Sequence, residues 1–239
     1  MASLTVFLQF FRVGNMHFYI HSKKIFQFIG IAVLTLTGLG AWNYFVGQSV
    51  GDFFLKESLM RLTDLDDETS FSTWFSTLLL LFCAFLMMII ALVKRSLKEG
   101  YVSHWWGLST IFLLLSIDEA SQIHEIASGL SGVLGMAEQE GRILWVVPYI
   151  LFVLAVAGIY AKFLWSLPGH IRNLFCLAGA IYVGGAIGLE MLGFFLPSDV
   201  YLFILIEEFM EMAGIAILAY ALLIYLNGYI TDIQVHLRQ

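Results

Sequence analysis

The sequence predicts an all-α, polytopic membrane protein that forms a single bundle of six transmembrane helices. Of its 239 residues, 60% are hydrophobic and 13% are charged, and the mean hydropathy is +0.86. These values lie outside the range of soluble globular domains. Because a helix needs roughly 20 apolar residues to cross a bilayer, the chain has room for about six short-looped spans. We therefore expect residues 1–239 to form one membrane domain.

Six apolar stretches are each long enough to cross the bilayer as a helix, which satisfies its own backbone hydrogen bonds in lipid. They are 25–47, 71–93, 104–127, 143–165, 174–196 and 201–226. Residues 1–24 instead predict an interfacial segment, since they combine several phenylalanines with Arg12, Lys23 and Lys24. Arg12 interrupts the apolar run and no small-residue cleavage site follows it, so a signal peptide is not favoured.

The basic residues predict the orientation of the bundle, because Lys and Arg accumulate in short cytoplasmic loops. Three of them, Lys56, Arg61 and Arg142, fall on one side of the predicted bundle. The other nine fall on the side that holds both termini: Arg12, Lys23, Lys24, Lys94, Arg95, Lys98, Lys162, Arg172 and Arg238. We therefore expect both termini to be cytoplasmic, in a bacterial inner membrane.

The longest predicted external connection, 48–70, contains the acidic stretch "TDLDDETS". Counted from Asp64, it is similar to the start of a calcium-binding loop. The sixth position of that loop needs glycine for its turn, but here it is Thr69. The favoured interpretation is that Asp67 and Glu68 lie near a helix N-terminus, where the helix dipole stabilises acidic groups.

Seven carboxylates fall inside the predicted spans. They are Asp118, Glu119 and Glu125 in the third span, Glu190 in the fifth, and Glu207, Glu208 and Glu211 in the sixth. A charged side chain at the centre of a membrane helix costs at least ~2.5 kcal/mol, and such residues usually mark functional sites. The group is therefore the strongest functional signal in the sequence.

The positions of these acids along their helices predict that they meet. At about 1.5 Å per residue, Glu119, Glu190 and Glu208 lie ~12, ~9 and ~10 Å below the outer ends of their spans, and Glu211 lies ~15 Å below. Helical phase places Glu207, Glu208 and Glu211 in one sector of about 100°. Asp118, Gln122 and Glu125 share a face of the third helix by the same rule.

The favoured hypothesis is a metal-dependent membrane enzyme that acts on a lipid or another small substrate. Carboxylates with a histidine suit an unidentified divalent metal ion, which could activate water or polarise a head group. The expected ligands are Asp118, Glu119, Glu190, Glu207, Glu208 and Glu211. His124 and Glu125 are the candidate acid–base residues, and Arg142 and Gln122 the candidate substrate-binding residues.

Two other functions stay open. Intramembrane acids are also typical of cation-coupled or proton-coupled transporters. A structural or cofactor-binding subunit of a larger complex is the third possibility, given 21 phenylalanines and six tryptophans. Membrane lipids and a small molecule or lipid head group are the expected partners, and nothing in the sequence indicates nucleic-acid binding.

Three segments of the sequence resemble a group of uncharacterised bacterial polytopic membrane proteins. They are "DLDDETSFSTWFSTLLLL", "LSIDEASQIHE" with its DE and HE pairs, and "EEFMEMAG" with its EE..E pattern. The resemblance covers about two thirds of the chain and implies a bacterial membrane protein. It implies nothing about a reaction or a substrate.

Overall fold

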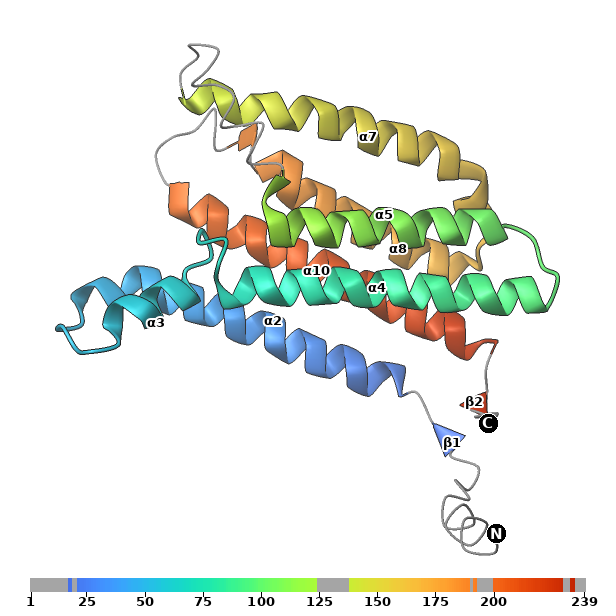
Figure 1. Ribbon diagram of the computed structural model, residues 1–239, viewed down its shortest axis with the longest axis horizontal. Helices are drawn as coiled ribbons and strands as arrows, with labels where there is room; N and C mark the ends of the chain where they lie inside the picture. Colours follow the sequence, from blue (N-terminus) through green and yellow to red (C-terminus); the bar gives the residue numbers. More distant parts are fainter. Residues whose placement is uncertain are drawn as a thin grey trace, which may run out of the picture.

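The computed structural model is a bundle of long helices that run roughly parallel to one another (Figure 1). It describes residues 17–18, 21–123, 138–189, 191–192, 200–229 and 233–234. The long helices are α2 (Ser22–Phe45), α4 (Phe71–Ser96), α5 (Val102–Ser121), α7 (Glu138–Ser166), α8 (Gly169–Val183) and α10 (Val200–Asn227). The π-helical turn η3 (Gly184–Leu189) extends α8.

Short elements complete the described chain. Between α2 and α4 lie the 3-10 turn η2 (Gly47–Ser49) and the helix α3 (Lys56–Thr63). Residues His17–Phe18 (β1) pair antiparallel with Ile233–Gln234 (β2). Apart from this two-residue pairing, the described residues are helical or in loops, so the expected all-α class is confirmed for them.

The centre of the bundle is formed by α4 and α10. Half of the apolar window of α4 and 61% of that of α10 are buried, compared with 11% for α7. Fully buried side chains such as Met87 and Cys83 of α4 share one apolar core with Met212 and Leu222 of α10. The helix α7 runs along the margin of the bundle (Figure 1), and its backbone approaches that of α8.

Polar and small side chains join the helices where they approach closely. The hydroxyls of Ser109 and Ser116 in α5 donate to the carbonyls of Ala84 and Thr77 in α4, at 2.8 and 2.9 Å. A Cβ on Gly214 of α10 would lie 2.8 Å from the backbone nitrogen of Tyr182 in α8. Interhelical hydrogen bonds and small interface residues are the usual means of helix packing in lipid.

Within the described residues, five helical segments are long and apolar enough to cross a membrane, which indicates a membrane protein. They are Ser22–Phe45, Phe71–Ser96, Val146–Ser166, Gly169–Leu189 and Tyr201–Asn227. The prediction of six such spans is not met, because α5 is 20 residues long but carries many polar side chains that lower its hydropathy. It also ends at Ser121 instead of residue 127, since Gln122 adopts a left-handed conformation with φ 55°.

The ends of the chain bear on whether α5 crosses as well. The Asn227 side-chain amide at the end of α10 donates to the Ser22 hydroxyl at the start of α2, at 2.6 Å. The start of α2 and the end of α10 therefore lie on the same side of the bundle. An odd number of crossings cannot return the chain to the side where it began. We expect α5 to supply the sixth crossing. The cytoplasmic location of the termini stays a prediction.

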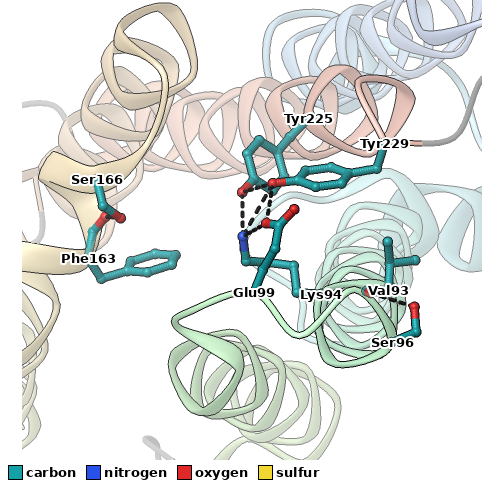
Figure 2. A network of polar contacts seen from close by, with 8 residues as sticks. All are labelled: Val93, Lys94, Ser96, Glu99, Phe163, Ser166, Tyr225 and Tyr229. Atoms are coloured by element: carbon teal, nitrogen blue, oxygen red, sulfur yellow. Dashed lines mark hydrogen bonds and ion pairs between the residues drawn. The ribbon is translucent and has the colours of Figure 1, made fainter.

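A polar cluster joins the ends of α4 and α10 on the side of the termini (Figure 2). The Lys94 ammonium donates to Glu99 Oε2 at 2.6 Å and to the hydroxyl of Tyr229 at 3.3 Å. Tyr229 in turn donates to Glu99 at 2.9 Å, and Tyr225 lies 3.2 Å from the Tyr229 hydroxyl. The hydrogen bonds that Glu99 accepts from Lys94 and Tyr229 hold the pKa of its carboxyl group below the ordinary value of 4.5.

We predict that the close approach of α8 and α10 cannot tolerate a side chain at Gly214. In Gly214→Val the new Cβ would meet the backbone of α8, so the helices must separate, at a cost of roughly 1–3 kcal/mol in the free energy of unfolding. Unfolding in detergent, followed by tryptophan fluorescence, measures the change. Gly38→Val is the control, because a Cβ there meets nothing within 4 Å; equal loss in both variants contradicts the prediction.

We also predict that the Lys94–Glu99 cluster makes stability depend on pH in the acidic range. Because the folded pKa of Glu99 is lowered, its contribution is complete above 4.5 and is lost as the pH falls through the lowered folded value. Thermal unfolding between pH 3 and 7 measures this, and Glu99→Gln should flatten the acid limb of the profile. Asp52→Asn is the control and should leave the profile unchanged, because the Asp52 side chain is fully exposed in its ion pair with Lys56.

Candidate functional site

A cavity of about 1220 Å³ lies among α4, α5, α7, α8 and α10. Acidic side chains line one end of it, and apolar side chains line the rest. The acids are Asp66, Glu68, Asp118, Glu119, Glu207, Glu208 and Glu211. They come from three separate parts of the chain: the loop before α4, the end of α5 and the start of α10.

The walls of the cavity follow the helical period. On α5, the lining residues Leu108, Ile111, Phe112, Leu115, Asp118 and Glu119 recur at the three- and four-residue spacing of one helix face. On α10, the lining residues Ile204, Glu207, Glu208, Glu211, Ile215 and Leu218 recur in the same way. On both helices one inward face is therefore apolar along most of its length and acidic at the same end of the bundle.

The carboxylates of these two helices are half-buried. Asp118 Oδ2 accepts a hydrogen bond of 2.5 Å from the hydroxyl of Tyr149, which belongs to α7. This contact ties the outer part of α7 to the acidic end of the cavity. Carboxylates bound by charge-assisted hydrogen bonds of this kind are held in a defined orientation.

The loop before α4 is fixed by its own packing. Leu65, 3% exposed, lies against Gly40 of α2, and the side chain of Asn43 donates to the carbonyl of Met60 at 2.6 Å. Ser70 caps α4 by accepting from the backbone nitrogen of Thr73 at 3.3 Å. The loop thereby presents Asp66 and Glu68 to the cavity.

Within this loop Asp67 has a local role. Its carboxylate accepts from the backbone nitrogen and the hydroxyl of Thr69, at 2.8 and 2.5 Å. These bonds lower the pKa of Asp67. Asp67 thus shapes the turn before α4, as the interpretation of an acid near a helix start implies, while its neighbours Asp66 and Glu68 line the cavity.

The structure brings together five of the six residues expected as metal ligands: Asp118, Glu119, Glu207, Glu208 and Glu211. The sixth, Glu190, lies outside the described residues, as do the acid–base candidates His124 and Glu125. Arg142 belongs to α7, but its side chain is not among those described.

Gln122 is placed differently from the prediction. It is the left-handed residue that ends α5 and is not among the residues that line the cavity. Within the described residues, the face that Asp118 and Gln122 were expected to share is interrupted at Gln122, because helical phase is lost where α5 ends.

Sequence reasoning missed several lining residues. Asp66 and Glu68 were interpreted as loop or helix-start acids, although they precede a span whose first turn faces the same end of the bundle. Tyr149 and Tyr182 gave no signal, because tyrosines are ordinary residues near the ends of membrane helices. A search for acidic residues that flank the predicted spans, as well as those inside them, would have found Asp66 and Glu68.

No group of three or more His, Cys, Asp or Glu side chains among the described residues is arranged to hold a metal ion. The metal centre expected from the sequence is therefore not supported by this part of the chain.

A protein family described as "Domain of unknown function (DUF8692)" matches residues 28–225. No curated protein and no solved structure matches the chain.

Proposed function

Since the chain belongs to the DUF8692 family, whose description assigns no activity, we propose from the cavity itself that the protein binds a positively charged guest within the membrane. The guest is held by the carboxylates of α5 and α10 together with those of the loop before α4. The acidic end of the cavity is the binding site, and the apolar remainder adjoins it.

One observation carries this proposal: acids from three separate segments line the same end of one cavity. Opposite charges attract more strongly in a medium of low dielectric constant than in water. Like charges on neighbouring carboxylates also repel one another, and a cation that enters between them removes part of that repulsion. Both the attraction to the carboxylates and the relief of their mutual repulsion therefore favour a positively charged guest at this end of the cavity.

A divalent metal ion is the second candidate guest, and with it a metal-dependent enzyme. Carboxylate oxygens are the ligands that Mg²⁺ and Mn²⁺ prefer. Because the described residues include no preformed group of three ligands, a metal here needs further oxygen atoms, from the guest, from water or from the rest of the chain. In that case the metal is held by one or two of the lining carboxylates, drawn from Asp118, Glu119, Glu208 and Glu211, and a bound substrate completes the coordination.

Coupled transport of a cation or proton has less support. The described lining residues at the other end of the cavity include Phe163, Leu164 and Phe175, which are apolar. A continuous polar path from one side of the bundle to the other is the usual feature of ion transport, and these residues do not extend it. A site for binding fits the lining better than a route for conduction.

The proposal predicts that small cations stabilise the folded protein through the acids of α10. In neutral detergent, butylammonium chloride or MnCl₂ should raise the free energy of unfolding by about 2–3 kcal/mol when present at ~100 times the Kd. Thermal unfolding measures the shift, with butanol and NaCl at matched concentrations as references. The double variant Glu208→Gln/Glu211→Gln should lose the shift, and without a guest it should be at least as stable as the original chain, because charge repulsion is removed.

Glu57→Gln on α3 is the matched control, since Glu57 is exposed and does not line the cavity. Its response to cations should equal that of the unchanged protein. The proposal fails if neither cation stabilises the protein beyond NaCl, or if the double variant and the control respond alike. A response to MnCl₂ without a response to butylammonium favours the metal candidate.

A further inference from the structure

The apolar part of the cavity indicates what kind of cation the site accepts. Pockets for small molecules usually enclose about 300–1,000 Å³. The cavity, at about 1220 Å³, exceeds this range, and most of the residues that line it are apolar. A small inorganic cation would occupy only its acidic end.

The apolar part is long. Lining residues on α7 run from Tyr149 beside the acids to Trp165 near the other end of the helix, which is ~24 Å at 1.5 Å per residue. The hydrocarbon core of a bilayer is roughly 30 Å thick, so the cavity extends over most of that depth. Its long axis follows the helices and so lies along the direction of lipid chains.

Two side-chain contacts join α7 to α5, one at Tyr149 and one near the end of the helix at Phe163. At the acidic end the Tyr149 hydroxyl donates to Asp118. At the other end Phe163, 2% exposed, packs edge to face on Trp105, with ring centroids 5.1 Å apart. Between these anchors, Phe152 and Ala157 line the cavity, and 43% of Phe152 remains uncovered by other protein atoms.

Small side chains keep this space open. The lining includes Ala157 and Ala161 of α7 and Gly179 of α8. A Cβ on Gly179 would meet nothing within 4 Å, so the wall of α8 faces unfilled space at this point. An apolar chain fits along such a wall without displacing protein atoms.

We propose that the guest is an amphiphile with a positively charged amine head group and a long apolar chain, the head among the carboxylates and the chain along α7 and α8. This inference rests on the proposed cation binding. Charge complementarity selects the head group, because the phosphate of an ordinary phospholipid would be repelled at the acidic end. A transmembrane helix of a partner is less suitable as the occupant, since α7 already lines one side of the space.

The test compares radiolabelled dodecylammonium and butylammonium for binding to the full chain in phosphatidylcholine nanodiscs, with binding to protein-free nanodiscs subtracted. Dodecylammonium should bind at least about tenfold more tightly than butylammonium, since its longer chain gains apolar contact. Gly179→Phe fills the apolar part and should weaken dodecylammonium binding at least about tenfold while changing butylammonium binding less than about twofold. Ala157→Phe, which fills the same space from α7, should give the same pattern.

Gly158→Phe is the matched control: it neighbours Ala157, has open space at its Cβ and does not line the cavity. It should bind both cations as the unchanged protein does. Equal affinity for the two cations, or unchanged dodecylammonium binding in both filling variants, overturns the amphiphile while leaving cation binding intact. Failure of both cations to bind overturns cation binding itself, as does dodecanol binding as tightly as dodecylammonium.

Discussion

Carboxylates on membrane-spanning helices need to be kept away from hydrocarbon and stabilised by polar or positively charged partners. This constraint accounts for the arrangement of the bundle. Each such group is costly in an apolar medium unless protons, cations or polar partners stabilise it. The acids of α5 and α10 lie at one level and line one cavity. The central packing of α4 against α10, and the anchors of α7 at Asp118 and Trp105, hold that cavity between the helices.

The two ends of the bundle treat charge differently. On the side of the termini, Lys94 and Glu99 satisfy each other within a cluster of tyrosine hydroxyls, and the result is a clamp between α4 and α10. At the opposite end the lining groups are acidic and face a large open space. Only the second arrangement offers a guest an opposite charge and room to enter, which is why function is assigned there.

Much of this was predictable from the sequence, because apolar length determines membrane helices and helical period determines which residues share a face. The five described helices that are long and apolar enough to cross a membrane lie over five of the predicted apolar stretches. Glu207, Glu208 and Glu211 line one cavity wall, as their spacing predicts. The end of α5 was not predicted, because the left-handed conformation of Gln122 that ends it has no clear signal in the sequence. The acids of the loop before α4 flank a predicted span and could have been found, but their position at the cavity depends on tertiary packing of Leu65 against Gly40.

Carbodiimide labelling tests whether the acids of α5 and α10 share one cavity, because the reagent modifies the carboxyl groups that it can reach. Peptide mapping would follow the labelling of Glu119 on α5 and Glu208 on α10 as dodecylammonium is added, with exposed Glu57 as the reference. If the two acids face one cavity, a single guest protects both over the same concentration range and leaves Glu57 unaffected. Protection of one helix without the other, or of neither, would contradict a shared site.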